Sequence, residues 1–215
     1  SLAQALLTKT ARLPVAERNW IELDTALDEA EKAMPNSPHV AILRADVLAA
    51  RDQNQMAVDL LTTTKDRLQN EIDGLTRQRA ALLAEAESLS GDAKQKRLAE
   101  ADELSTRIDG WRGLQSTIWR SLVRFAERRK DWDQADTIIQ SAEKSLGDGV
   151  PARLLRARSL ARRHGSEAAP RVRELLENAE GLSAAEQNEL GRYLAAIAFE
   201  LQDYATARRT CSRLL

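Results

Sequence analysis

Apolar residues recur at intervals of three and four along most of the chain, as they do on the buried face of an amphipathic α-helix. A clear run comprises Leu154, Leu155, Ala157, Leu160 and Ala161. Turn-forming residues interrupt the pattern at Pro14, Pro35–Pro38, Ser90–Asp92, Gly147–Pro151, His164–Ser166 and Glu180–Ser183. Alternating apolar and polar residues between hairpin-turn dipeptides, which would indicate strands, are missing from the sequence. The pattern therefore predicts an all-α protein made of helical hairpins.

One stretch of this pattern recurs along the chain. Lys130-Asp131-Trp132-Asp133-Gln134-Ala135 returns in degenerate form as Gln202-Asp203-Tyr204-Ala205-Thr206-Ala207. Residues 42–51 likewise match residues 154–163. These copies indicate a helical repeat of about 34 residues, each copy forming one pair of helices that stacks on the next. Such an architecture favours an extended recognition surface over a catalytic pocket.

The copies resemble the tetratricopeptide family. In that family a Leu-small pair lies between larger residues on helix A, and an aromatic residue followed by Ala opens helix B. The third copy reads Trp119, Leu122-Val123, Ala126, Trp132 and Ala135, and the last reads Leu194-Ala195, Ala198, Tyr204 and Ala207. Five copies cover residues 4–71 and 116–215. The resemblance implies a superhelix of hairpins that binds a protein or peptide, with helix A residues lining a concave groove.

Residues 72–115 depart from the repeat. A heptad-like series of apolar residues runs through Leu68, Ile72, Leu75, Leu82, Ala86 and Leu89, and resumes through Leu98, Ala101, Leu104, Ile108 and Trp111. The spacing predicts one helix that continues to about Leu89 and a return helix that starts near Ala93. We expect them to form an antiparallel coiled-coil arm. Arg79 falls on its seam, where a carboxylate such as Asp102 or Glu103 would have to neutralise it.

The predicted organisation is one continuous solenoid in three parts. Residues 1–71 hold the first two repeats, residues 72–115 the inserted hairpin, and residues 116–215 the third to fifth repeats. Ser1 at the start and an apolar helical pattern that continues to Leu215 lead us to expect a piece of a longer protein.

Composition and motifs argue against an enzyme. The chain has two histidines and one cysteine, and neither histidine has another ligand residue at metal-binding spacing. No Gly-rich phosphate loop follows a strand pattern. Cys211 lies at an apolar repeat position, so we expect it to be a buried small side chain rather than a nucleophile. The sequence thus predicts no catalytic residue, no metal site and no cofactor.

The charge and hydropathy of the chain exclude some classes of binding partner. The net charge of the whole chain is −1, and the first repeat is acidic, which argues against nucleic acid. No apolar run approaches the length of a membrane span, so membrane insertion is not expected. These features leave the compartment open, with the cytoplasm slightly favoured over export.

Arginines gather on consecutive helix A segments. Arg120, Arg124 and Arg128 follow each other at intervals of four, and so do Arg158 and Arg162 in the next repeat. Through the family resemblance, the predicted partner-binding residues of the groove are Arg120, Arg124, Arg128, Arg158, Arg162, Arg192 and Phe199, accompanied by Glu127, Glu189 and Glu200. Residues 116–164 carry eleven basic and six acidic residues, an excess of +5.

Two interpretations of the function remain open. A guanidinium group can form bidentate hydrogen bonds with a carboxylate or a phosphate. The first interpretation is therefore a non-catalytic interaction module whose groove binds an acidic peptide segment. The second is a structural, oligomerisation or spacer role of the coiled-coil arm, through which two copies could associate. The chain has 25 arginines against seven lysines. Pairing with local glutamates on a solvated face would therefore explain the same arginines without any ligand.

Overall fold

The protein is described by a computed structural model that covers residues 2–14 and 18–214. Every regular element in those residues is a helix, which confirms the all-α prediction. The chain divides into two compact units, residues 1–118 and residues 119–215, and the boundary falls inside helix α5.

The first unit begins with three short helices. They are α1 (Leu2–Arg12), α2 (Ile21–Ala33) and α3 (Pro38–Ala50). Leu23 and Leu27 of α2 pack against Val40 and Val47 of α3, and all four are at most 2% exposed. The first helix packs against both of the others, so this part of the unit has its own small apolar core.

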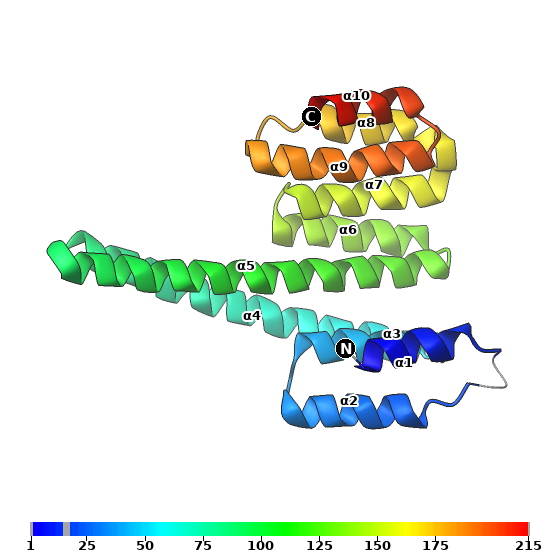
Figure 1. The fold of residues 1–215 in the computed structure, drawn as a ribbon, viewed down its shortest axis with the longest axis horizontal. Coiled ribbons are helices and arrows are strands. Elements are labelled where there is room, and N and C mark those ends of the chain that lie inside the picture. Colours follow the sequence, from blue (N-terminus) through cyan, green and yellow to red (C-terminus); the bar gives the residue numbers. More distant parts are fainter. Residues whose placement is uncertain (1, 15–17, 215) are drawn as a thin grey trace. The chain divides into compact units, whose positions relative to one another are not determined.

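Two long helices complete the first unit and run antiparallel (Figure 1). They are α4 (Asn54–Glu87) and α5 (Gly91–Arg128), of 34 and 38 residues. The predicted turn between them is confirmed, within two residues at each helix end. At 1.5 Å per residue these helices are about 50 and 57 Å long.

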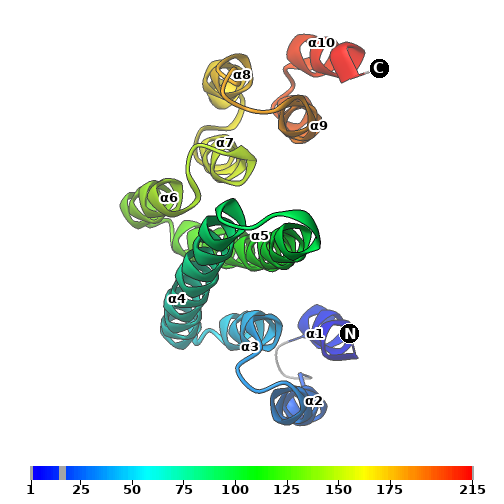
Figure 2. The same ribbon diagram turned by 90° about the vertical axis from the view of Figure 1, so that its left-hand side faces the viewer.

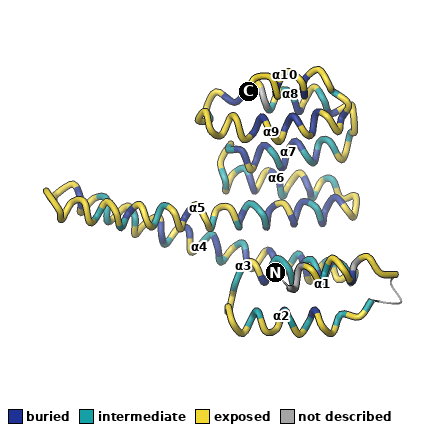
Figure 3. Tube along the Cα trace, in the orientation of Figure 1, coloured by how far each residue is buried: buried dark blue, intermediate teal, exposed yellow. Residues whose placement is uncertain are grey.

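Apolar and polar side chains join α4 and α5. Ile72 and Leu75 pack against Ile108, and Nε2 of the buried Gln115 donates to Oε1 of Gln69 at 2.7 Å. Toward the turn most residues are exposed or half-buried, as Figure 3 shows. Arg79 lies on this seam, and among the described residues no ion pair joins it to Asp102 or Glu103. Its Nε is buried without a hydrogen-bond partner. The expectation that Asp102 or Glu103 neutralises Arg79 is therefore wrong.

The second unit consists of the end of α5 and a stack of shorter helices. These are α6 (Trp132–Leu146), α7 (Val150–His164), the 3₁₀ turn η2 (Gly165–Ala168), α8 (Ala169–Glu177), α9 (Ala184–Glu200) and α10 (Tyr204–Leu214). Viewed end-on, α6 lies beside α7, and α8 lies beside α9 (Figure 2). Helix α7 packs against α6, α8 and α9, so it is the central element of this unit.

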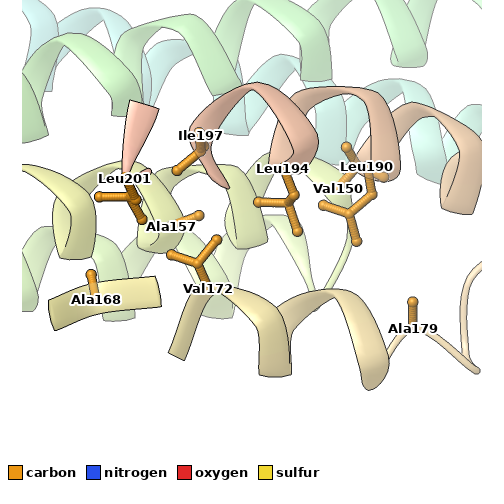
Figure 4. Packing of buried hydrophobic residues seen from close by; sticks show 9 residues of the cluster. All are labelled: Val150, Ala157, Ala168, Val172, Ala179, Leu190, Leu194, Ile197 and Leu201. Atoms are coloured by element: carbon orange, nitrogen blue, oxygen red, sulfur yellow. The ribbon is translucent and has the colours of Figure 1, made fainter. Parts of the chain in front are cut away.

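One apolar cluster joins α7, α8 and α9. Figure 4 shows Leu190 and Leu194 of α9, Ala157 of α7 and Val172 of α8 gathered in it. Each is at most 2% exposed. Small residues such as Ala157 let the helices approach closely while the leucines fill the space between them.

The same turn closes three helical hairpins. Asp52, Lys130 and Gln202 all adopt the left-handed conformation, with φ of 60°, 59° and 63°. In each case the next residue donates its backbone N–H to a carbonyl five residues earlier, at 2.9 to 3.0 Å: Gln53 to Leu48, Asp131 to Ala126, and Asp203 to Ala198. This is the hydrogen bond of a left-handed helix C-terminus. The sequence match between residues 130–135 and 202–207 therefore corresponds to a repeated backbone geometry.

Asp203 links the last of these turns to α8. Its Oδ1 accepts the backbone N–H of Thr206 at 3.1 Å, and its Oδ2 accepts from Nη2 of Arg173 at 2.9 Å. The hydrogen bond from Arg173, aided by Thr206, lowers the pKa of Asp203 from 3.8 to about 2. The carboxylate is thus held in its charged form at the start of α10.

Asp203→Asn is expected to lower the free energy of unfolding by about 1 kcal/mol at about pH 7, a value reduced for solvent screening of the half-exposed Arg173. The folded-state pKa lies below the unfolded one. The stabilisation is therefore present above about pH 4 and is lost as the pH falls toward 2. Urea unfolding of both proteins at about pH 7 and about pH 2.5 measures this difference. An equal loss at both pH values would show that the charge of Asp203 is not its source.

Cys211 corrects one expectation. It is free and exposed on α10, so the prediction of a buried side chain is wrong. Tyr204 lies on the same side of this helix, two turns earlier, and is 56% exposed. No described element covers this side of α10, and a repeat position is buried only where a neighbouring helix packs against it.

Candidate functional site

A pocket of about 520 Å³ lies between α7 and α9. It is lined by Arg158, Ala161, Arg162, Gly165, Ser166, Tyr193, Ala196, Ile197, Glu200, Leu201 and Gln202. Its lining combines small and aliphatic side chains with the polar groups of two arginines, a tyrosine and a glutamate. The mixture suits a ligand with both an apolar and an anionic part.

Arg158 of the pocket lining is one of three arginines that are linked by their charges. Arg120 and Arg124 lie one turn apart on α5, and Arg158 lies on α7. Partial burial lowers the pKa of the Arg120 guanidinium, and the like charges of Arg158 and then Arg124 lower it further. The ring of Tyr193 from α9 is also within electrostatic range of Arg120. Arg120 therefore lies close enough to both Arg158 and Arg124 for like charges to repel, and we call these three residues the arginine cluster.

Arg158 is the least compensated member of the arginine cluster. It is half-buried and lines the pocket. Among the described residues it has neither a hydrogen bond nor an ion pair. A half-buried cation near a like charge gains from an anion that joins it.

The neighbouring carboxylate Glu127 is engaged elsewhere. Its Oε2 accepts a hydrogen bond from Nη1 of Arg162, and its side chain is only 5% exposed. The other oxygen, Oε1, is buried without a partner. Arg162, one of the predicted arginines, therefore pairs with a local glutamate, as the alternative interpretation expects. Arg158 does not.

Arg128, Arg192 and Phe199 lie away from the pocket. All three are exposed, and none of them belongs to its lining. On α9 the lining residues Tyr193, Ala196 and Glu200 share one face. Arg192 and Phe199 lie about 100° around the axis from it. Phe199 instead makes an edge-on contact with Tyr204, with ring centroids 5.3 Å apart.

Tyr193 is a polar lining residue that the sequence did not reveal. Alignment of the repeats makes Arg192 the equivalent of Arg120. It therefore selects Arg192 on α9 instead of the adjacent Tyr193. Two helices that face each other across a pocket present different sides to it. Residues at equivalent repeat positions on these helices therefore do not both line the pocket. Tyr193 is 45% exposed, an unusual state for an aromatic residue between the buried Leu190 and Leu194.

Two further pockets lie on the side of α7 that faces α6 and α8. Their volumes are about 280 and 460 Å³, and Arg156, Leu160 and Arg171 line both. Here the arginines of α7 are compensated: Arg156 pairs with Glu143, and Arg163 pairs with Asp136 at 2.9 Å. This side therefore shows the ion pairing of an ordinary solvated surface.

The described residues contain no group of three or more side chains suited to holding a metal ion. In the same part of the chain, every helix is too short or too polar to cross a bilayer. The available chemistry at the pocket is hydrogen bonding and charge attraction toward an anion.

Comparisons with known proteins identify no relative: no family model, no curated protein and no solved structure matches the chain.

Proposed function

We propose that the second unit is a non-catalytic interaction module that binds an acidic peptide segment in the groove between α5, α7 and α9. One observation carries this proposal. Arg158 lines the pocket, has no hydrogen-bond or ion-pair partner among the described residues, and is within electrostatic range of Arg120. A bound carboxylate or phosphate would relieve the repulsion and accept charge-assisted hydrogen bonds from the Arg158 guanidinium.

We further propose that the helices form a tetratricopeptide-like superhelix with a coiled-coil arm. The repeated left-handed turn after α3, α5 and α9 supports the repeat, as does the packing of α7 against α9. The antiparallel contacts of α4 with α5 support the arm. In such a superhelix, α5, α7 and α9 would serve as the helices that line the concave side.

Arg158→Gln is expected to weaken binding of acidic peptides about tenfold or more without loss of helix content, since no ion pair of the folded chain is broken. The probes are two labelled pools of short random peptides, one with glutamate and one with glutamine at the same fixed positions. Fluorescence anisotropy with the full chain should show binding of the glutamate pool only.

Arg163→Gln is the matched control. Arg163 lies on the same helix but on the side facing α6, where it pairs with Asp136. Its replacement should leave the affinity for the glutamate pool unchanged. If both substitutions weakened peptide binding equally, the loss of one positive charge would explain the effect, and the position of Arg158 would not matter. No binding of either pool by the wild-type chain would reject the groove and favour a role of the arm formed by α4 and α5.

A further inference from the structure

We infer that the last helical hairpin carries a second binding site, which takes an acidic amphipathic helix from a partner protein. The site is the exposed face of α9 and α10 that includes Arg192, Phe199, Tyr204, Arg208 and Cys211, and we call it the end face. None of these residues lines the pocket between α7 and α9. The inference is therefore independent of the proposed function.

The contact between Phe199 and Tyr204 joins the two helices of the end face. At about 100° per residue, Arg192 lies on the same side of α9 as Phe199. Arg208 and Cys211 likewise lie on the same side of α10 as Tyr204. Within the second unit, α10 is the last helix of the stack (Figure 2). The five residues therefore form one exposed face of the last hairpin.

The position of Phe199 is buried in the two earlier hairpins that have the same left-handed turn. It lies three residues before the left-handed residue, which is Gln202 in the last hairpin. In the α3–α4 and α5–α6 hairpins, this position holds Ala49 and Glu127. Both are buried, whereas Phe199 is 63% exposed.

The position of Cys211 shows the same difference. It lies nine residues after the left-handed residue, and the α3–α4 and α5–α6 hairpins have the buried Leu61 and Ile139 there. In the α5–α6 hairpin the covering element is α7, which packs against α6 and whose Arg162 donates to Glu127. The end face thus presents two positions that the following helix covers in the α5–α6 hairpin.

The charges of the end face select an acidic partner. Among the described residues, neither Arg192 nor Arg208 has a side-chain hydrogen bond or an ion pair. Further around α10, the exposed Arg209 and Arg213 add positive charge, and the helix contains no Asp or Glu. Carboxylates of a partner would accept charge-assisted hydrogen bonds from these guanidinium groups.

Phe199 distinguishes the helix that fits here from α7. In the α5–α6 hairpin, the buried Glu127 accepts a hydrogen bond from Arg162 of α7. Phe199 takes the place of Glu127 in the last hairpin, so the arriving helix must bring an apolar side chain to it. Two exposed rings with arginines on both helices match a helix that has an apolar stripe flanked by carboxylates.

A second copy of the chain would fit less well. In a stack continued by another copy, α1 of that copy would follow α10. Helix α1 contains Lys9 and Arg12 and no acidic residue, so it would add positive charge next to the arginines of the end face. An acidic helix of another protein avoids this repulsion.

The test uses the full chain and two labelled pools of helical peptides of 15 residues, the length of α7. Both pools carry an apolar stripe of varied aliphatic residues at intervals of three and four. The flanking positions are glutamate in one pool and lysine in the other. Fluorescence anisotropy should show that the glutamate pool binds about tenfold more tightly, or better. A glutamate pool with a central proline, which breaks the helix, should not bind.

Phe199→Ala and the double variant Arg192→Gln/Arg208→Gln should each weaken binding of the helical glutamate pool about tenfold. The control Arg163→Gln removes a positive charge outside the end face and should leave the affinity unchanged. Absence of binding by the glutamate pool, or equal binding of the lysine pool, would overturn the inference.

Cys211 gives a second readout at the site itself. It is the only cysteine of the chain and is exposed on the end face. Saturation with the glutamate pool should slow alkylation of Cys211 by iodoacetamide about fivefold or more, because the docked helix covers the thiol. The lysine pool should leave the rate unchanged. An unchanged rate in the presence of bound glutamate peptides would mean that they bind elsewhere.

The variants also separate the end face from the groove. Binding of the helical glutamate pool that survives Arg158→Gln and fails in Phe199→Ala supports the end face, whether or not the groove takes a peptide. The reverse result would overturn the end face and support the groove.

Two further measurements test other occupants of the end face. Sedimentation velocity that shows self-association of the wild-type chain, abolished by Phe199→Ala, would assign the end face to a second copy. Displacement of the glutamate pool by a single-stranded RNA oligonucleotide, at lower concentration than by the unlabelled pool, would assign it to nucleic acid. Either result would overturn the assignment to an acidic helix of a partner protein.

Discussion

Replacing Arg153 with methionine is expected to lower the free energy of unfolding by about 3 kcal/mol. The Arg153 side chain is only 7% exposed. Its Nη1 donates to the carbonyl oxygens of Leu175 and Asn178, at 3.1 and 2.6 Å, and its Nη2 donates to Oδ2 of Asp148 at 2.7 Å. Methionine is unbranched and replaces the apolar stem of the arginine. It would nevertheless leave the two carbonyl groups at the end of α8 without their donors.

Arg163→Met on the same helix is the comparison for this substitution. Arg163 also forms an ion pair, but its side chain is 36% exposed and that of Asp136 is 51% exposed. Exposed pairs contribute between about 0 and 1 kcal/mol, so its loss should be small. Urea unfolding monitored by far-ultraviolet circular dichroism measures the free energy of unfolding of both variants. Similar losses for the two variants would mean that the carbonyl contacts of Arg153 add nothing to a surface ion pair.

The helices and their turns were predictable because their signals are local. Helical periodicity is readable within one element, and the match between residues 130–135 and 202–207 lies in a turn whose hydrogen bonds join residues five apart. The turn between α4 and α5 was likewise marked by Ser90 and Gly91, and Gly91 adopts a φ of 59°. Local sequence therefore specified where the helices begin and end.

The side chains that hold distant elements together were not predictable in the same way. Nothing near Arg153 in the sequence indicates that it binds carbonyl groups 22 and 25 residues later. The exposure of Cys211 depends on whether another helix covers α10, and its own helix carries no signal of that. Both depend on packing between helices.

The groove was predictable in part. The four-residue spacing of Arg120 and Arg124 placed them on one face, and the repeat placed Arg158 on the next equivalent helix. On α9 the same reasoning selected Glu200, which lines the pocket, but also Arg192 and Phe199, which do not, and it missed Tyr193. A family pattern assigns positions within a repeat, but it does not determine which wall of the groove a side chain reaches in a particular stack.

Replacing Leu194 with alanine is expected to lower the free energy of unfolding by about 3 kcal/mol while leaving the groove intact in the folded protein. Leu194 is 0% exposed and points from α9 toward Val172 of α8 (Figure 4). The substitution removes three carbon atoms from the core that joins three helices, and the cavity left there adds to the lost burial. Phe199→Ala is the matched control on the same helix. Phe199 is 63% exposed and contacts mainly Tyr204. Its loss should be below about 1 kcal/mol.

The Leu194 variant also separates stability from recognition. Leu194 does not line the pocket, whereas the adjacent Tyr193 does. Under conditions in which the variant remains folded, its affinity for an acidic or phosphorylated peptide should therefore equal that of the wild type. Arg158→Gln should show the reverse, with unchanged urea unfolding and weaker binding. For both variants, urea unfolding measures the stability and anisotropy titration measures the peptide affinity. A Leu194 variant that is fully folded but cannot bind would show that the groove depends on the exact packing of α9, and the arginines alone would then not account for recognition.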